Sequence, residues 1–116
     1  MTDKREIRNA RIESVRFGKE DHGIMTFYCM LDYGGSGQGF GGWALDSWDQ
    51  EKGRRVGTAY GMEWIMRLFA ALEVSDMSEL VGLPVRVEGT YGTVHRIGHF
   101  MKDKWFDPDL LNAEAT

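Results

Sequence analysis

The chain has 116 residues, 42% of them hydrophobic and 28% charged, and its formal net charge is −4 at pH 7. This length and composition are typical of one globular domain with one hydrophobic core, so we treat residues 1–116 as a single domain. The acidic balance excludes a general nucleic-acid-binding protein, which would carry a basic surface, and we expect no direct binding to DNA. Any site for an anion must therefore be a local basic pocket.

The cysteine count and the lengths of the apolar runs exclude further classes of protein. Cys29 is the only cysteine, which excludes a disulfide framework and a cysteine-based metal site. Because it lies in the apolar run 24–31, we expect an inert buried thiol. No apolar run approaches the length that crosses a bilayer, so we expect no signal or membrane segment and a cytoplasmic protein.

The first part of the chain predicts three β-strands. Residues 7–17 alternate apolar and polar side chains, which is typical of a strand. Residues 24–31 are largely apolar on both faces, so we expect this second strand to be central and covered on both sides. Residues 33–37 form a glycine-rich hairpin loop, and residues 38–45 form the returning strand, which its glycines weaken.

Two helical segments are predicted next. Ser47, with Gln50 three positions later, has the form of a capping box, which predicts a short helical turn that ends at Gly53. Thr58 is a good N-cap for a long helix over residues 58–73. Apolar residues follow Thr58 at helical spacing: Met62, Ile65, Met66, Phe69 and Leu72.

The apolar arc of this long helix covers more than half of its circumference, because Trp64, Leu68 and Ala71 widen it. The remaining outward stripe contains Glu63, Arg67 and Ala70. A lone sheet covers only one face of a helix, so we expect a second helix or another subunit to pack on this one. We therefore expect at least a homodimer, with the helix near its interface.

The second half of the chain predicts a strand pair between short helices. Residues 75–80 form a short helical turn, residues 84–91 form a strand, and its partner runs from Val94 to Phe100. Asp107 followed by Pro108 predicts the start of a short C-terminal helix. The order βββ-α-ββ-α predicts an α+β fold. We expect a mainly antiparallel sheet of about five strands, with one long helix and short helices packed on one face.

Three cations, Lys52, Arg54 and Arg55, come shortly before the predicted N-cap at Thr58. Helix N-termini attract phosphate through their unpaired N–H groups and their positive dipole end, and arginine binds phosphate with a planar fork. These residues are therefore a candidate anion site. The alternative is a solvated loop in which the arginines pair with nearby acids: Asp46, Asp49 or Glu51.

A second candidate site lies near the C-terminus. Lys102 and Lys104 supply positive charge, and Trp105 and Phe106 supply aromatic faces on which a nucleobase could stack. The alternative is that Trp105 and Phe106 form an aromatic latch that holds the C-terminal segment on the core.

No pattern in the chain points to catalysis. His95 and His99 lie four apart on a predicted strand, about 13 Å from one another, which forbids chelation by this pair. No His, Cys and Asp cluster has metal-ligand spacing, and no serine lies in a nucleophile elbow. The glycine run over 33–43 leads into another strand instead of a helix, which excludes a dinucleotide fingerprint. We expect no catalytic residue, no metal and no cofactor.

Four segments together resemble a known family of small phage proteins. They are Glu20-Asp21-His22-Gly23, Gly37-Gln38-Gly39-Phe40-Gly41-Gly42, Arg54-Arg55-Val56-Gly57-Thr58-Ala59-Tyr60-Gly61-Met62 and Asp103-Lys104-Trp105-Phe106-Asp107-Pro108. In texture and order they resemble the phage anti-Thoeris sponge family, the first of the Thoeris anti-defence families. The resemblance covers nearly the whole chain.

The resemblance implies a specific function. Members of that family bind cyclic nucleotide signals made by bacterial immune enzymes, chiefly a cyclised ADP-ribose isomer, and sequester them without cleavage. Some members assemble from dimers into larger oligomers and also hold cyclic oligonucleotides. The Arg54–Arg55 segment matches by type and context, and Lys102 and Lys104 match more weakly.

These observations lead to an expectation and one alternative. We expect a non-enzymatic binding protein that captures a cyclic nucleotide with Arg54, Arg55 and Thr58 or with Lys102, Lys104 and Trp105. The alternative is a phage accessory or inhibitor protein that acts through protein–protein contacts, with exposed aromatic residues such as Trp48.

Overall fold

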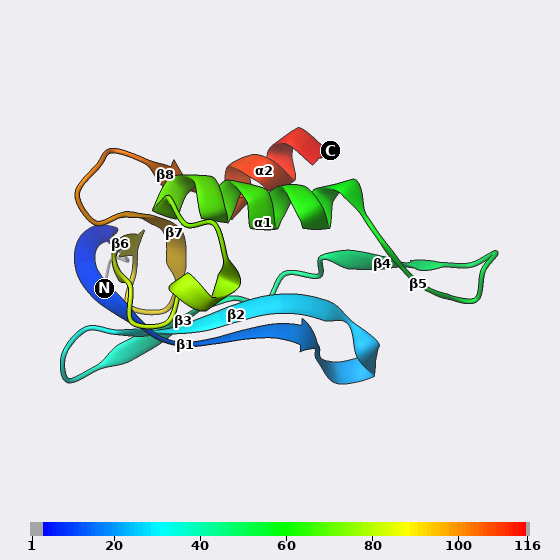
Figure 1. Ribbon diagram of the computed structural model, residues 1–116, viewed down its shortest axis with the longest axis horizontal. Helices are drawn as coiled ribbons and strands as arrows, with labels where there is room; N and C mark the ends of the chain where they lie inside the picture. Colours follow the sequence, from blue (N-terminus) through cyan, green and yellow to red (C-terminus); the bar gives the residue numbers. More distant parts are fainter. Residues whose placement is uncertain (1–3, 116) are drawn as a thin grey trace.

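The computed structural model describes residues 4–115, which form eight strands, two α-helices and two short 3-10 turns (Figure 1). Six strands form one antiparallel sheet in the order β3-β2-β1-β6-β7-β8, and β4 and β5 form a separate two-stranded hairpin. The strands of the large sheet are β1 (Glu6–Lys19), β2 (Met25–Asp32), β3 (Gly37–Gly41), β6 (Pro84–Gly89), β7 (Val94–His99) and β8 (Trp105–Phe106). The other elements are β4 (Asp46–Asp49), β5 (Arg54–Gly57), η1 (Asp21–Gly23), α1 (Ala59–Leu72), η2 (Met77–Glu79) and α2 (Pro108–Ala115).

The α+β class and the antiparallel sheet are confirmed, although the large sheet has six strands instead of about five. The helix over 58–73 is confirmed as α1, the turn over 75–80 as η2, and the C-terminal helix as α2, which begins at Pro108. The two α-helices lie in contact on one side of the sheet (Figure 1). No helix in the described part of the chain is long and apolar enough to cross a membrane.

The long strand β1 organises the sheet because it pairs with two neighbours in turn. Its first half pairs with β6, and its second half pairs with β2. A β-bulge between Ile12 and Ser14 interrupts the register, and bulges bend and twist a strand. The sheet curls so far that β3 contacts β7, and the Gln38 side chain donates hydrogen bonds to the carbonyls of Thr90 and Tyr91. The result is a partly open barrel.

The core fills this curl with aromatic side chains around Trp64 of α1. Trp64 is fully buried, and ring contacts surround it. Its partners are Phe27, Phe40, Trp43 and Phe106, with ring centroids 4.8–5.9 Å from that of Trp64. Truncating a buried aromatic residue typically costs about 3–5 kcal/mol, so this cluster fixes α1 on the sheet.

The predicted helical turn over 47–53 is wrong. Ser47 lies in β4, where Ser47 pairs with Val56, so its segment is extended. The apparent capping signal comes from a hairpin turn, in which a carboxylate oxygen of Asp49 accepts from the Lys52 amide at 2.9 Å and the Asp49 carbonyl accepts from the Gly53 amide. The hairpin projects beyond the body of the protein (Figure 1).

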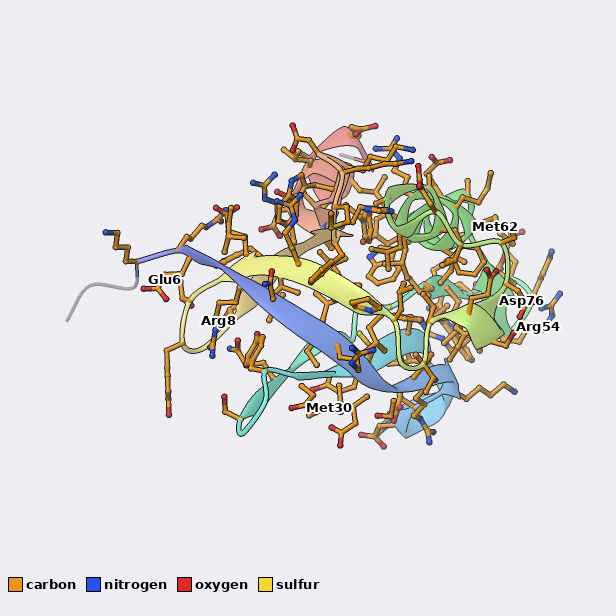
Figure 2. The ribbon with its side chains drawn as sticks, turned by 60° about the vertical axis from the view of Figure 1, so that its left-hand side comes forward. Glu6, Arg8, Met30, Arg54, Met62 and Asp76 are labelled. Atoms are coloured by element: carbon orange, nitrogen blue, oxygen red, sulfur yellow. The ribbon has the colours of Figure 1, made fainter. Side chains whose placement is uncertain are left out.

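The predicted coverage of the second strand is wrong for one of its faces. Phe27, Cys29 and Leu31 of β2 are buried in the core, but Tyr28 on the opposite face is 40% exposed. Met30 lies on this same outer face and points away from the core (Figure 2). Within residues 4–115, no element covers this side of the sheet at Tyr28, so β2 is central in the sheet but covered only on the core side there.

The predicted outward stripe of α1 is also wrong in part. Arg67 donates to Glu63 on α1 and makes a bidentate ion pair with Glu114 of α2, with N–O distances of 2.8 Å. The charged stripe therefore faces α2. The side chains of Met62 and Met66 are exposed instead, at 63% and 58%. A second helix thus packs beside α1, as expected, but it leaves a pair of methionines uncovered.

Candidate functional site

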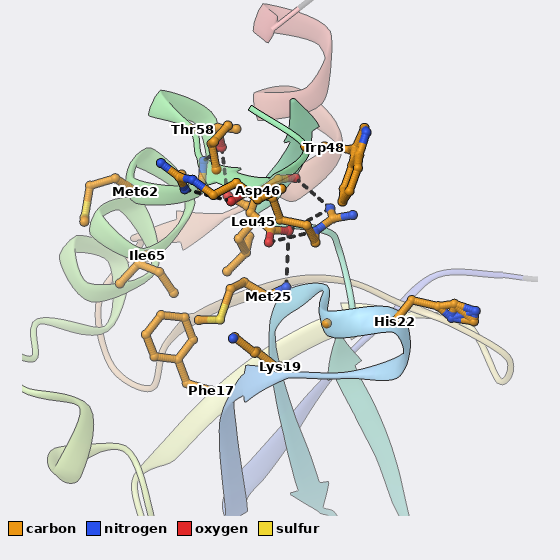
Figure 3. Close-up of a pocket in the computed structure, with 17 residues that line it drawn as sticks. Phe17, Lys19, His22, Met25, Leu45, Asp46, Trp48, Thr58, Met62 and Ile65 are labelled. Carbon is orange, nitrogen blue, oxygen red and sulfur yellow. Dashed lines mark hydrogen bonds and ion pairs between the residues drawn. The ribbon is translucent and has the colours of Figure 1, made fainter. Parts of the chain in front are cut away.

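A cavity of about 760 Å³ lies between the first half of α1, the β4–β5 hairpin and the adjoining ends of β1 and β2 (Figure 3). This volume is within the range of small-molecule sites. The apolar lining includes Phe17, Met25, Leu45, Trp48, Met62 and Ile65. The polar lining includes Lys19, His22, Asp46, Arg54, Arg55 and Thr58.

The floor of the cavity exists because β1 extends beyond the part of the sheet that α1 covers. Phe17 lies opposite the buried Phe27, so it is on the core-facing side of the sheet, yet its side chain is 47% exposed. Lys19 and Met25 pair next to it and continue the same face. An apolar surface that would otherwise be core is thereby open to a ligand.

The N-terminal end of α1 forms one wall. The Thr58 hydroxyl accepts a hydrogen bond from the Gly61 amide at 2.9 Å, which confirms Thr58 as the N-cap, and donates to the Leu45 carbonyl at 2.8 Å. Gly61 has to be a glycine, because a Cβ atom there would lie 1.8 Å from the Leu45 oxygen. The chain entering β4 is thus clamped to the helix N-terminus.

Arg55 is held by an internal carboxylate. Its Nε and Nη2 atoms donate to the two carboxylate oxygens of Asp46 at 2.8 and 2.9 Å. Asp46, whose side chain is only 7% exposed, also accepts from the Met25 amide at 3.2 Å. The hydrogen bonds from Arg55 lower the pKa of Asp46, so the carboxylate stays charged. The alternative pairing of an arginine with Asp46 is therefore observed, and it fixes the hairpin to β2.

Arg54 is in a different setting. Its side chain is exposed, and its Nη1 atom donates to the Arg55 carbonyl at 3.1 Å. Within residues 4–115, no carboxylate forms an ion pair with Arg54. Figure 2 shows Arg54 pointing outward on the same side of the molecule as Met62. Arg54 therefore remains available to an external anion, as does the exposed Lys19 of β1, for which no ion pair is found among residues 4–115.

The second predicted group lies at the other end of α1. Lys102 donates to both carboxylate oxygens of Glu73 at 2.9 Å, and Lys104 donates to one of them at 2.6 Å. Hydrogen bonds from Lys104 and then Lys102 lower the pKa of Glu73 to about 2. Glu73 caps the C-terminus of α1, and a helix of 14 residues separates it from Thr58 by about 21 Å. The structure does not bring the two groups into one site.

Trp105 is packed in a way that fits the latch interpretation. Its ring lies against Gly98, where a Cβ atom would be 2.7 Å from the ring. The guanidinium groups of Arg96 and Arg86 lie 4.1 and 5.0 Å from the ring centroid. Phe106 beside it is buried against Trp64. These contacts hold β8 on the edge of the sheet.

Sequence reasoning missed the apolar part of the cavity, chiefly Phe17, Met25 and Trp48. One signal was present in β1, where the apolar alternation shifts by one position. The core-facing residues are even-numbered at Ala10 and Ile12 and odd-numbered from Val15 onward. This change of parity marks the bulge. No signal in the sequence showed that β1 extends beyond the part of the sheet that α1 covers, because this depends on where the helix packs.

The described residues contain no group of three or more His, Cys, Asp or Glu side chains that could hold a metal ion. His95 and His99 both lie on β7, as predicted, with separate partners: His95 lies 3.8 Å from Asp109, and His99 lies 3.3 Å from Glu73. No family model, no curated protein and no solved structure matches the chain.

Proposed function

We propose that this protein is a phage counter-defence protein that binds a cyclic nucleotide immune signal and sequesters it intact in the host cytoplasm. The candidate ligands are cyclic ADP-ribose isomers and, beyond them, cyclic oligonucleotides. The observation that carries the proposal is the cavity at the N-terminus of α1, which joins an apolar floor to an unpaired arginine. The family resemblance of four sequence segments supports the same ligand class.

The two halves of the cavity match the two halves of such a ligand. Phe17 and Met62 offer apolar surface to a nucleobase, and Trp48 on the hairpin offers an aromatic face. Arg54 offers an unpaired guanidinium to a pyrophosphate, in the cavity that the N-terminal residues of α1 also line. The charge of Arg55 in the same wall is paired with that of Asp46, but its Nη1 atom has no hydrogen-bond partner among residues 4–115 and can donate to the same pyrophosphate.

Assembly is part of the proposal. Met62 and Met66 leave an apolar strip exposed on α1, and this strip continues into the lining of the cavity through Met62. We infer at least a homodimer with this strip at or near the interface. Sedimentation of the purified protein is expected to show a dimer or a larger oligomer, and a monomer at high micromolar concentration would contradict this part.

One observation favours a different function. Trp48 is 56% exposed on a hairpin that projects from the body, which is also how a protein–protein inhibitor would present an aromatic anchor. In that case Trp48→Ala would abolish binding to a protein partner, and a cyclic nucleotide would show no affinity for the wild-type protein.

Calorimetric titration with a cyclic ADP-ribose isomer tests the proposal directly. We expect saturable binding, and heating the complex should release a ligand of unchanged mass. Arg54→Ala should weaken binding about tenfold or more, because a hydrogen bond to a charged group contributes about 1.5–3 kcal/mol. Lys52→Ala, on the same hairpin but outside the cavity lining, is the matched control and should bind like the wild type. No binding, or hydrolysed product beyond one equivalent, would overturn the proposal.

A further inference from the structure

A second hollow, of about 440 Å³, lies on the face of the sheet opposite the core. It is formed where η1 joins β1 to β2, and Gly42 and Ala44, which follow β3, complete it. Its lining includes Asp21, Thr26 and Tyr28. Side chains alternate along β2, so Thr26 and Tyr28 face away from the core-facing Met25 that lines the first cavity. The two hollows are therefore on opposite sides of β2.

Thr26 is the unusual residue of this hollow. It is only 5% exposed, and its hydroxyl has no hydrogen-bond partner among the described residues. Buried hydroxyls are normally hydrogen-bonded, because an unsatisfied one destabilises the fold. Its neighbour across the sheet is Gly18, and a Cβ atom added to Gly18 would have no other atom within 4 Å. Valine has nearly the same shape without the hydroxyl, so the polar group is not needed for packing.

Tyr28 provides a ring at the side of the hollow. Its hydroxyl end lies over Gly39 of β3, where a Cβ atom would be 1.7 Å from the phenol oxygen. Glycine at this position therefore allows the ring to lie across the sheet. Because Tyr28 is 40% exposed, an external apolar or aromatic group can pack against it.

The charge at the rim decides which ligands fit. Glu20 is paired with Arg16, whereas the Asp21 side chain is 94% exposed and has His22, at 3.5 Å, as its only basic neighbour in the described part of the chain. The rim thus carries an unneutralised carboxylate on a protein of net charge −4. An anion is disfavoured here, and a cationic or strongly N–H-donating group is favoured.

We propose that this hollow is a second binding site, which takes a small molecule with an apolar or aromatic ring and a cationic amine or amidine. The ring packs against Tyr28, and the cation is attracted by Asp21. The Thr26 oxygen is buried, so the hollow has to open slightly at Thr26 for a ligand N–H to donate to its hydroxyl. The site is separate from the cavity at α1 in both position and charge preference, and it does not depend on the function proposed for that cavity.

Benzamidine is a suitable probe, with benzoate as its isosteric anion. We expect a titration followed by amide chemical shifts to perturb Thr26, Tyr28 and Gly42, and benzoate to bind at least tenfold more weakly. Thr26→Val should weaken benzamidine binding about fivefold or more without lowering Tm. Thr93→Val, at an exposed turn outside the hollow, is the matched control and should bind benzamidine like the wild type.

Asp21→Asn provides a second test that does not touch a buried position, and it should weaken benzamidine several-fold while leaving benzoate unchanged. Three results would each overturn the proposal: benzoate binding as tightly as benzamidine, unchanged affinity in both Thr26→Val and Asp21→Asn, or chemical shifts confined to the cavity at α1. Loss of folding in Thr26→Val would contradict the statement that the hydroxyl is not needed for packing, and Asp21→Asn alone would then decide.

Discussion

The two ends of α1 hold basic residues in contrasting settings. At the C-terminal end, Lys102 and Lys104 converge on one carboxylate, that of Glu73. At the N-terminal end, Arg55 alone occupies the nearby carboxylate, and Arg54 stays unpaired beside an apolar cavity. A basic stretch in a sequence therefore shows where positive charge lies, but not whether those side chains are free to bind a ligand. Availability depends on which acidic residues the fold brings within reach.

Gly61→Ala is expected to have the largest effect on this contrast, because it disrupts only the N-terminal end. The new Cβ would overlap the Leu45 carbonyl, so the chain entering β4 must move away from the helix. We expect a loss of about 3 kcal/mol in the free energy of unfolding, measured by urea denaturation. Gly57→Ala, where a Cβ meets no atom, should be nearly neutral. Equal effects of the two substitutions would show that Leu45 is not clamped.

Asp46→Asn sharpens the comparison by removing the charge that fixes Arg55. We expect Tm at pH 7 to fall by about 5 °C, while Glu51→Gln at the exposed hairpin tip should leave it unchanged. Because the pKa of Asp46 is lowered in the folded state, its stabilisation is present above the unfolded pKa and is lost on acidification. The difference between variant and wild type should therefore shrink below pH about 4. A difference independent of pH would argue against the ion pair.

Glu73→Gln probes the opposite end and should have the smallest effect, because the two lysines that donate to Glu73 are exposed. We expect a slight fall in Tm at pH 7. The pKa of Glu73 is lowered to about 2, so this difference should persist to mildly acidic pH and disappear as pH falls toward 2. Glu13→Gln, at an exposed position of β1, serves as the reference. An increase in Tm would show that the ion pairs of Glu73 with the two lysines do not stabilise the fold.

Local signals in the sequence were sufficient for α1. The Thr58 cap and the apolar spacing predicted its position, and the structure places α1 at Ala59–Leu72. The hairpin was missed because Ser47 and Gln50 have the spacing of a capping box. The pairing of strand β4 with strand β5 joins residues farther apart in the chain, and a local motif does not show it. The outward stripe of α1 was misassigned for the same reason, since the partner of Arg67 is Glu114, 47 residues away.

The candidate site could be predicted only as far as its charges. Of the three cations before Thr58, Arg54 and Arg55 line the cavity and Lys52 does not. The apolar floor depends on the bulge in β1 and on how far β1 extends beyond the part of the sheet that α1 covers. The assignment of Arg55 to Asp46 and of Lys102 to Glu73 also depends on tertiary packing. Composition and residue spacing therefore do not predict which acidic residue pairs with each cation.

The most direct test compares two double variants in calorimetric titration with a cyclic ADP-ribose isomer. Arg54→Ala/Arg55→Ala removes the two arginines at the N-terminal end, and Lys102→Ala/Lys104→Ala removes the two lysines at the C-terminal end. We expect affinity to fall about a hundredfold or more in the first variant and to stay within about twofold of the wild type in the second. Unchanged affinity in the arginine variant, or a comparable loss in the lysine variant, would contradict the assignment of the site to the N-terminal end of α1.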